Sequence, residues 1–299
     1  MQWPRIFTAM ITPFTPEGAL AVHEAAKLAR WLVRHGSGGL VLAGTTGESP
    51  TLSLEERRAL FEAVREAVPE VPVWVGTGHN STAETVRLTM AATEWGADGV
   101  MVVTPYYNKP PQEGLYRHFC TVAEHTPLPV MIYNVPGRTS VTMLPETVAA
   151  VMRDRPNVRA VKEAAGSLAP VQRLVDLCPP EAKVYTGDDH LFFPTLAVGG
   201  YGVVSVASHL VGDEMAALWQ AWERGDVDQA RHLHRRLTPI FEELFRVSNP
   251  IPLKWAMNQL GLPAGPLRLP LSYPADPAVF HPLARWIDSL RVAERVRDL

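Results

Sequence analysis

The sequence predicts a (β/α)8 TIM barrel, in which helices surround a ring of parallel strands, with a C-terminal helical subdomain. Short apolar runs, mostly five or six residues long and rich in Val or Ile, alternate with longer amphipathic segments, as buried parallel strands alternate with helices. The runs end near residues 12, 44, 76, 104, 133, 162, 187 and 205, so the intervals are 32, 32, 28, 29, 29, 25 and 18 residues. This regular spacing favours the barrel.

Eight strands and seven intervening helical segments follow from this pattern. The strands are expected at 6–11, 39–43, 71–75, 99–103, 130–133, 158–162, 183–186 and 202–207. Helical periodicity marks 22–35, 81–95, 113–124, 145–152, 168–177 and 189–198. A further helix begins after Ser53, because Ser53 with Glu56 three residues later is a capping box.

After about residue 226 the strand pattern stops. Helices are expected at 227–247, 250–260 and 278–296, so we divide the chain into a barrel domain, 1–225, and a helical subdomain, 226–299. A doubly wound sheet is the alternative fold, but it usually carries a glycine fingerprint after its first strand. Here that position reads Thr12-Pro13-Phe14-Thr15.

The composition excludes several classes of protein. With 46% hydrophobic and 20% charged residues the chain is globular, and a net charge of −3 gives no general attraction to nucleic acid. There is no uncharged apolar run of 18 residues and no signal-peptide pattern at the N-terminus, so no membrane association is expected. Two cysteines, Cys120 and Cys178, cannot form a disulfide framework. A cytoplasmic location is therefore expected.

Lys162 is the sharpest candidate for catalysis. Active sites of such barrels lie at the C-terminal ends of the strands, and alternation puts Lys162 on the same face as Ala160. If that face is the interior, loss of hydration disfavours the ammonium form and leaves free amine, the nucleophile that forms a Schiff base with a carbonyl. The alternative is a lysine paired with a carboxylate, and the strand pattern alone leaves both open.

Other candidates lie at the same ends of neighbouring strands. Tyr133 ends the fifth strand, where its phenol could relay protons to a carbonyl oxygen or simply pack against the backbone. The hydroxyls of Thr45 and Thr46 could hold a carboxylate, and Arg138 could grip one through two hydrogen bonds. The alternatives stay open: the loop with Thr45 and Thr46 could be an ordinary β-to-α turn, and Arg138 could be a surface arginine without a ligand. No metal is expected, because the only acidic pair at a strand end is Asp188-Asp189.

Five motifs, each after the appropriate strand, together resemble the dihydrodipicolinate synthase and N-acetylneuraminate lyase superfamily of pyruvate-dependent Schiff-base aldolases. They are GTTGES at 44–49, TPYYN at 104–108, YNVPGRT at 133–139, KEAAG at 162–166 and TGDD at 186–189. The paired threonines and the arginine of the third motif resemble the synthase branch. That resemblance implies condensation of pyruvate with L-aspartate 4-semialdehyde to 4-hydroxy-tetrahydrodipicolinate, on the route to lysine and diaminopimelate, with no metal or organic cofactor.

The resemblance also implies roles for individual residues. Lys162 forms the imine, and a proton relay uses Tyr133, Thr46 and a Tyr107 that reaches in from a neighbouring subunit. Pyruvate is held by Thr45 and Thr46, and the semialdehyde carboxylate by Arg138. These residues are joined by Val204, whose backbone carbonyl faces the site. Members of the family are commonly homotetramers built as dimers of dimers.

A feedback site for lysine is only partly present. Ser49, Asn80, Glu84 and Tyr106 match the family's site, whereas two positions that are histidines in sensitive members are Leu54 and Arg57 here. Because an arginine repels the ligand's ammonium groups, weak or absent inhibition is expected.

Two further functions are alternatives. One is a related aldolase that cleaves a 2-keto-3-deoxy sugar acid or 4-hydroxy-2-oxoglutarate, and Arg138 argues against it because sugar-acid aldolases usually lack this residue. The other is a catalytically silent barrel that acts as a binding module, which the intact Lys162 and Tyr133 argue against.

Overall fold

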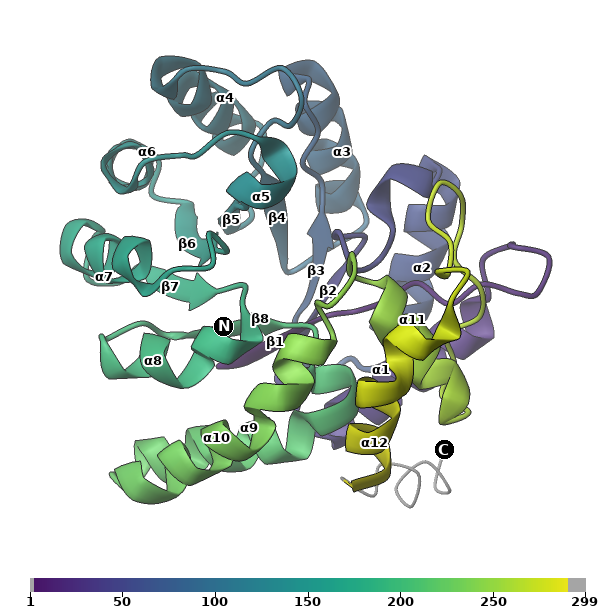
Figure 1. The fold of residues 1–299 in the computed structure, drawn as a ribbon. Helices are drawn as coiled ribbons and strands as arrows, with labels where there is room; N and C mark the ends of the chain where they lie inside the picture. Colours follow the sequence, from purple (N-terminus) through teal and green to yellow (C-terminus); the bar gives the residue numbers. More distant parts are fainter. Residues whose placement is uncertain (1–2, 290–299) are drawn as a thin grey trace. The chain divides into compact units, whose positions relative to one another are not determined.

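The computed structural model describes residues 3–289 and contains a closed barrel of parallel strands in the order β1-β2-β3-β4-β5-β6-β7-β8 (Figure 1). The predicted barrel is therefore confirmed. Each strand ends within three residues of its expected end. The strands are β1 (Ile6–Ala9), β2 (Gly39–Leu42), β3 (Val73–Gly76), β4 (Gly99–Val103), β5 (Val130–Asn134), β6 (Val158–Glu163), β7 (Lys183–Thr186) and β8 (Gly202–Ser205).

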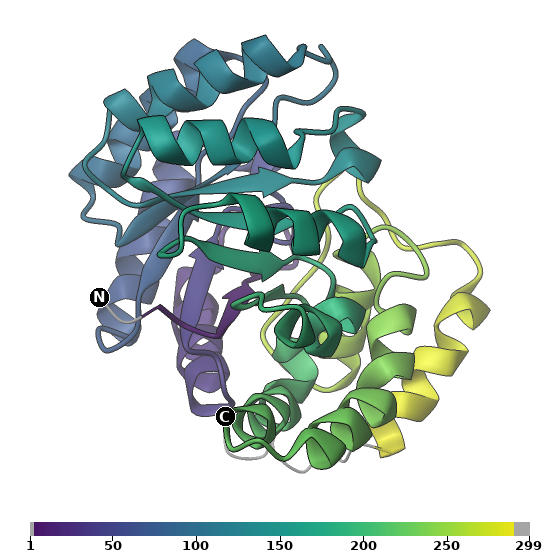
Figure 2. The same ribbon diagram turned by 90° about the vertical axis from the view of Figure 1, so that its left-hand side faces the viewer.

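The chain divides into two compact units, one made of 1–71 and 205–299 and the other of 72–204. In the second unit, helices follow the strands in turn and lie outside them (Figure 1). Figure 2 shows α4, α6 and α7 side by side, and α4 and α7 both contact α6. The helices of this unit are α3 (Thr82–Glu94), α4 (Gln112–Glu124), α5 (Pro136–Thr139), α6 (Pro145–Asp154), α7 (Leu168–Leu177) and α8 (Phe192–Ala197), with a short 3-10 turn, η2 (Asp189–Leu191).

The strand register in this unit fixes which side chains can meet. Met131 of β5 lies beside Ala160 of β6, and Tyr133 lies beside Lys162 two residues further along each strand. All four side chains are buried. Because alternate residues of a strand share a face, these two rows lie one above the other on the same side of the sheet.

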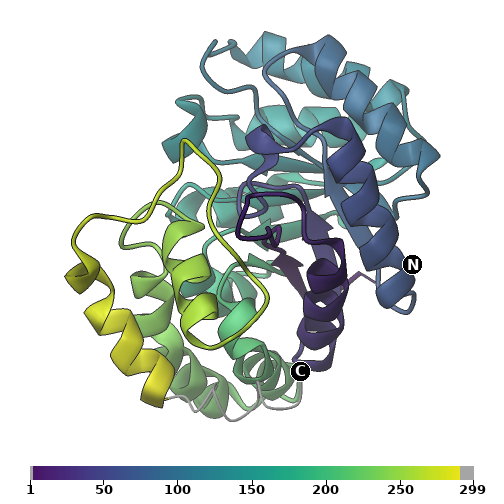
Figure 3. The same ribbon diagram turned by 90° about the vertical axis from the view of Figure 1, so that its right-hand side faces the viewer.

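The first unit holds β1, β2 and the two chain ends. Its helices are α1 (Val22–Arg34), α2 (Leu54–Ala67), α9 (Ser208–Glu223), α10 (Val227–Glu243), α11 (Ile251–Gln259) and α12 (His281–Ser289), with 3-10 turns η1 (Ser49–Thr51) and η3 (Pro277–Phe280). The helix α12, yellow in Figure 3, packs against α10 and α11. The predicted capping box is confirmed, since Ser53 Oγ accepts from the Glu56 backbone and Glu56 Oε2 accepts from the Ser53 backbone.

Some elements differ from expectation. The helices α5 and α9 were not anticipated, and the segment between β7 and β8 is a 3-10 turn followed by a six-residue helix rather than one helix. The last expected helix, 278–296, begins as η3 and continues as α12 to Ser289, and its remainder lies outside the described residues. The proposed boundary between residues 225 and 226 stays a prediction.

Candidate active site

The centre of the candidate site is the pair formed by Lys162 and Tyr133. Their backbones are register partners at the C-terminal ends of β6 and β5, and the Lys162 Nζ atom lies 4.1 Å from the centroid of the Tyr133 ring. Both side chains are 5% exposed. The structure thus brings together the two residues that the sequence singles out most strongly, and it buries the amine against an aromatic face.

Apolar side chains lie beneath this pair. Met131 and Ala160 precede Tyr133 and Lys162 by two residues on their strands and have no exposed surface. Water is therefore excluded from the strand side of the amine, as the sequence predicts for a lysine on the interior face. The alternative for Lys162 was an ion pair with a carboxylate. Among residues 3–289 the structure records no such pair for this lysine.

Gly187 packs closely against Lys162, and the sequence analysis did not select it. A Cβ atom at this position would lie 2.7 Å from Lys162 Cε and 2.7 Å from the Ala164 side chain. Carbon atoms of side chains do not approach so closely, so the absence of a side chain at Gly187 leaves the space in which the Lys162 chain lies. The TGDD motif contains this glycine, but only the folded structure shows that it lies against Lys162 and Ala164.

A second pair lies one residue further along the same strands. Asn134 is the register partner of Glu163, and its Nδ2 donates to Glu163 Oε2 over 2.8 Å. Asn134 also binds the backbone of Met143, through its Oδ1 and its Nδ2. Burial raises the pKa of Glu163 to about 7, even though the Asn134 amide favours the charged form. This carboxyl, which follows Lys162 directly, therefore changes its charge near neutral pH.

Asp188 is the other carboxyl close to the lysine. Burial raises the pKa of Asp188, while the backbone N–H of Gly166, which donates to its Oδ2 over 3.0 Å, and the charge of Lys162 oppose that shift. Asp188 precedes η2 and makes no side-chain cap there.

The remaining predicted residues of the second unit occupy different surroundings. Arg138 lies in the short helix α5 directly after β5 and is exposed. Tyr107 is 87% exposed and has a φ of +76°, a left-handed conformation that is uncommon for a side chain of this size. Val204 lies on β8 and is completely buried. The structure of one chain does not bring Tyr107 into a buried position.

Thr45 and Thr46 belong to the loop after β2, in the first unit. Thr46 is 2% exposed, and its Oγ1 accepts a hydrogen bond from Asn249 Nδ2 over 2.9 Å. Thr45 is half-buried. Their placement beside Lys162 stays a prediction, but the Thr46 hydroxyl is held by a residue of the C-terminal segment that the sequence analysis did not select.

The same loop contains a buried ion pair. Glu48 has a φ of +54°, and its Oε1 lies 2.6 Å from Lys254 Nζ, with both side chains fully buried. Its Oε2 accepts from the backbone N–H of Arg268 over 2.9 Å. Lys254 also donates to the carbonyl of Pro266 and lies 4.3 Å from the centroid of the Phe14 ring. Burial lowers the pKa of Lys254 to about 8, against the opposing effect of Glu48.

Two of the residues expected to form a lysine site are already engaged by arginines. Arg57, which is 8% exposed, donates from Nη2 to both the carbonyl and the hydroxyl of Ser49 over 2.7 Å. Glu84 accepts two hydrogen bonds from Arg87. Asn80 is half-buried and accepts through its backbone carbonyl from Asn108, and the Tyr106 ring packs edge-on against His79.

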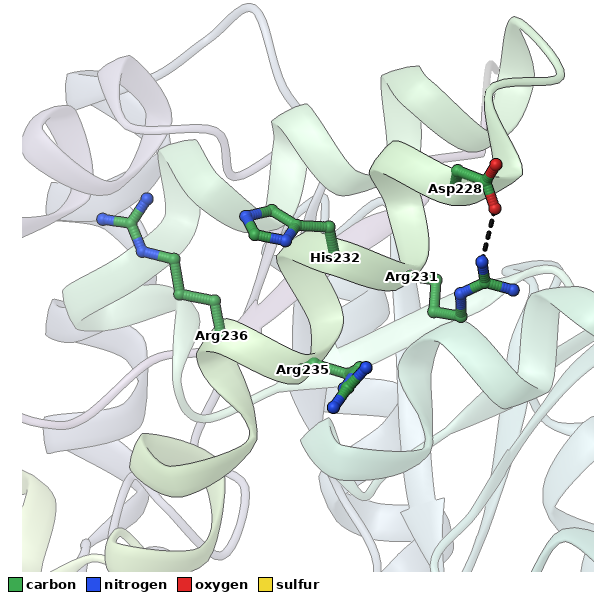
Figure 4. Close-up of a pocket in the computed structure, with 5 residues that line it drawn as sticks. All are labelled: Asp228, Arg231, His232, Arg235 and Arg236. Carbon is green, nitrogen blue, oxygen red and sulfur yellow. Dashed lines mark hydrogen bonds and ion pairs between the residues drawn. The ribbon is translucent and has the colours of Figure 1, made fainter.

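A separate surface concavity of about 580 Å³ lies on α10 (Figure 4). It is lined by Asp228, Arg231, His232, Arg235 and Arg236. All five side chains are exposed, Arg231 is paired with Asp228, and Arg231 and Arg236 point in opposite directions. These charges do not converge on a common point, so they form a solvated helix face rather than a built site.

Residues 3–289 show neither a cluster of metal ligands nor a membrane-spanning helix. No group of three or more His, Cys, Asp or Glu side chains in this range is arranged as a metal site requires. No helix in the same range is both long and apolar enough to span a membrane.

Comparison with known proteins gives one consistent family. Residues 2–277 match the model of the dihydrodipicolinate synthetase family. A 4-hydroxy-tetrahydrodipicolinate synthase of Moorella thermoacetica is 51% identical over 272 residues, which are 91% of this chain and 93% of that protein. The dihydrodipicolinate synthase of Thermotoga maritima has a similar structure, with a TM-score of 0.94 and 40% identity, over 97% of this chain and 99% of that one.

A third relative was solved with lysine bound. This protein, the dihydrodipicolinate synthase of Cyanidioschyzon merolae, has a TM-score of 0.93 and 40% identity, over 98% of both chains. The order of the motifs, the closed barrel and the buried Lys162–Tyr133 pair agree with these matches. The chain belongs to the dihydrodipicolinate synthetase family.

Proposed function

We propose that this protein is a synthase that condenses pyruvate with L-aspartate 4-semialdehyde to give 4-hydroxy-tetrahydrodipicolinate. The observation that carries the proposal is the buried Lys162 amine, 4.1 Å from the Tyr133 ring centroid at the C-terminal ends of two barrel strands. Relatives that are about half identical over nearly the whole chain are named for this activity.

The chemistry begins with attack of the Lys162 amine on the ketone carbon of pyruvate. The carbonyl oxygen takes up protons and leaves as water, and a protonated imine joins Lys162 to the substrate. The imine then draws electrons from the methyl group, which loses a proton and becomes an enamine. The enamine carbon attacks the aldehyde of the second substrate, whose oxygen is protonated to a hydroxyl.

Ring closure releases the enzyme. The amino group of the semialdehyde attacks the imine carbon, the bond to Lys162 breaks, and the lysine regains its proton. These steps need proton transfers, and none of them oxidises or reduces the protein. The residues of this chain therefore need to supply a nucleophile, proton transfers and binding of two carboxylates.

We assign the proton transfers to Tyr133, Thr46 and a Tyr107 from a second copy of the chain. Tyr133 is buried beside the amine, and a positioned phenol can pass a proton to the attacked oxygen. Tyr107 is exposed on the isolated chain, in a strained conformation that a contact with a neighbouring subunit would offset. A dimer is then the smallest active unit, and a homotetramer is the proposed assembly.

Substrate binding is assigned to residues of four segments. Thr45 and Thr46 hold the pyruvate carboxylate with hydroxyl and backbone donors, and Arg138 binds the semialdehyde carboxylate through its guanidinium. The backbone carbonyl of Val204 faces the substrates. This set offers hydrogen-bond donors for two carboxylates, one on each of the two proposed substrates.

Trapping with borohydride tests the proposal. Reduction in the presence of pyruvate should add the reduced adduct to the peptide that contains Lys162, as measured by mass spectrometry, and Lys162→Arg should abolish the adduct. The matched control is Lys183→Arg, because Lys183 also lies over a tyrosine ring, 4.7 Å from the centroid of Tyr201, but at the opposite end of its strand. An adduct on another lysine, or none, contradicts the proposed chemistry.

A coupled assay then separates the synthase from its alternatives. Aspartate semialdehyde should be consumed with pyruvate at a much higher kcat/KM than 2-keto-3-deoxy sugar acids or 4-hydroxy-2-oxoglutarate are cleaved. Tyr107→Phe should lower kcat without reducing Tm, and a wild-type rate would remove the shared relay. The silent barrel predicts neither a trapped pyruvate adduct nor any turnover.

A further inference from the structure

Asn249, in the C-terminal segment, donates a hydrogen bond to Thr46, a residue assigned to the proton relay. Asn249 precedes α11 and is 5% exposed, and its Nδ2 donates to Oγ1 of Thr46 over 2.9 Å. The two residues are 203 positions apart in the chain, so this contact exists only in the folded protein.

The geometry determines what the Thr46 hydroxyl can still do. A hydroxyl has one hydrogen to donate and two lone pairs that accept. Asn249 occupies one lone pair, which leaves the hydrogen and the second lone pair for a donor and an acceptor. A group that passes protons needs both. The asparagine therefore turns the hydroxyl without blocking it, and an amide that only donates here keeps the Thr46 hydrogen from pointing back toward Asn249.

A nearby ion pair holds the segments of Thr46 and Asn249 together. Two residues from Thr46, Glu48 is fixed by the Lys254 ammonium and by the backbone N–H of Arg268. Lys254 lies five residues after Asn249, on α11 itself, and its backbone N–H donates to the carbonyl of Pro250. The loop after β2 and the start of α11 are thus joined at two points, one a hydrogen bond and the other a buried ion pair.

We propose that Asn249 is a positioning residue that orients the Thr46 hydroxyl for proton transfer, with the Glu48–Lys254 pair holding the two segments together. This rests on the proposed function, in which Thr46 belongs to the relay. The C-terminal helical segment then has a part in the reaction besides packing.

Kinetics of Asn249→Ala are the first test. The expected result is a fall in kcat of about 10- to 100-fold, because a misplaced group in proton transfer loses about that much. KM for pyruvate should stay within about threefold, because the Thr45 hydroxyl and the backbone N–H donors of the loop remain in this variant and still hold the carboxylate. The matched control is Asn258→Ala in α11, because the Asn258 amide bonds Gly265 and Tyr273 instead, and this variant should keep the wild-type kcat.

A double-mutant cycle shows whether Asn249 acts through Thr46. Thr46→Val removes the hydroxyl, so Asn249→Ala should cost less than about twofold in kcat when added to it. An equal cost in both backgrounds would overturn the proposal. A rise in KM with unchanged kcat would overturn it too.

The isosteric variant Asn249→Asp adds a second measurement, the pH dependence of kcat, which a purely structural role of Asn249 would not change. An ionised aspartate accepts from the Thr46 hydroxyl and turns its hydrogen the wrong way, whereas a protonated one can still donate. The ratio of N249D to wild-type kcat should therefore fall as pH rises, while the ratio for N258D stays flat. A flat N249D ratio contradicts the orientation role, and if the alanine variant does not fold this variant still decides.

The two proposals fail in different ways. A wild-type protein that forms no pyruvate adduct on Lys162 overturns both the proposed function and the role of Asn249. If the wild-type protein is fully active and Thr46→Val lowers the rate but Asn249→Ala does not, only the role of Asn249 is overturned.

Discussion

The Nζ atom of Lys254 lies 2.6 Å from a carboxylate oxygen of Glu48, and neither side chain has any exposed surface. Fully buried ion pairs differ from surface pairs because each charge has lost its hydration and depends on the other. This pair joins the loop after β2 to α11, two segments of the first unit that are far apart in the sequence.

Breaking this pair should destabilise the protein strongly. Lys254→Met leaves the Glu48 charge buried without its partner, and the free energy of unfolding should fall by about 3–5 kcal/mol. The double variant E48Q/K254M should recover much of that loss, as urea unfolding will show. The control is Lys27→Met, which removes a similar contact to Glu24 of 2.8 Å between exposed side chains and should cost less than about 1 kcal/mol. Equal losses for the two lysines would mean that burial does not matter here.

Gly187→Ala should impair the reaction. The added methyl group would lie 2.7 Å from both Lys162 Cε and the Ala164 Cβ, so both have to shift, and the amine of the flexible lysine chain leaves its position beside Tyr133. A displacement of this kind should lower kcat/KM by about 100-fold and slow the borohydride trapping of pyruvate. Gly114→Ala in α4, whose Cβ would be 3.3 Å from its nearest neighbour, is the control and should react normally. Trapping at the wild-type rate in G187A would refute the steric argument.

Stability should depend on pH through Glu163. Its pKa is about 7 in the folded protein and near 4.5 when exposed, so between these values the folded state holds a proton that the unfolded state has lost. The free energy of unfolding therefore falls as pH rises from 4.5 to 7, by about 1–3 kcal/mol for this group. Glu163→Gln, which cannot ionise and can still accept from Asn134, should remove that fall. Urea unfolding at pH 5 and pH 8 measures it, with the exposed Glu62→Gln as control. A difference between E163Q and wild type that is the same at both pH values would contradict the prediction.

Inhibition by L-lysine should be weak or absent. Arg57 already holds Ser49 through two hydrogen bonds, and Glu84 is paired with Arg87, so a lysine ligand would meet an extra positive charge and an occupied carboxylate. Half-inhibition should lie at millimolar L-lysine or above, and Arg57→His should lower it. Titration of the initial rate checks both, and half-inhibition of the native protein well below millimolar would refute the prediction.

The sequence predicted the parts of this structure that depend on local pattern. Runs of Val and Ile between turns placed all eight strands, and alternation put Tyr133 and Lys162 at the same ends of neighbouring strands, where the register of β5 and β6 makes them partners. The capping box at Ser53 was found because both of its bonds lie within four residues.

What the sequence could not show depends on contacts between distant segments. Lys254 looks like an ordinary tail lysine until Glu48, 206 residues away, is seen beside it. Asn249 and Gly187 carry no signal of their own, since an asparagine before a proline and a glycine after a strand are common in turns. The 87% exposure of Tyr107 likewise becomes visible only in the folded chain.

The contacts of Asn249, Lys254 and Arg268 with the loop after β2 also bear on how the protein is made. During synthesis the ribosome releases residues 44–49 long before these three partners. The emerging chain can form its early strands and helices, yet that loop lacks its buried counterion and its amide donor until the last fifth of the polypeptide is being made. With Asn249 in its proposed role, a chain that stops before residue 249 should lack these contacts and turn over more slowly than the full-length protein.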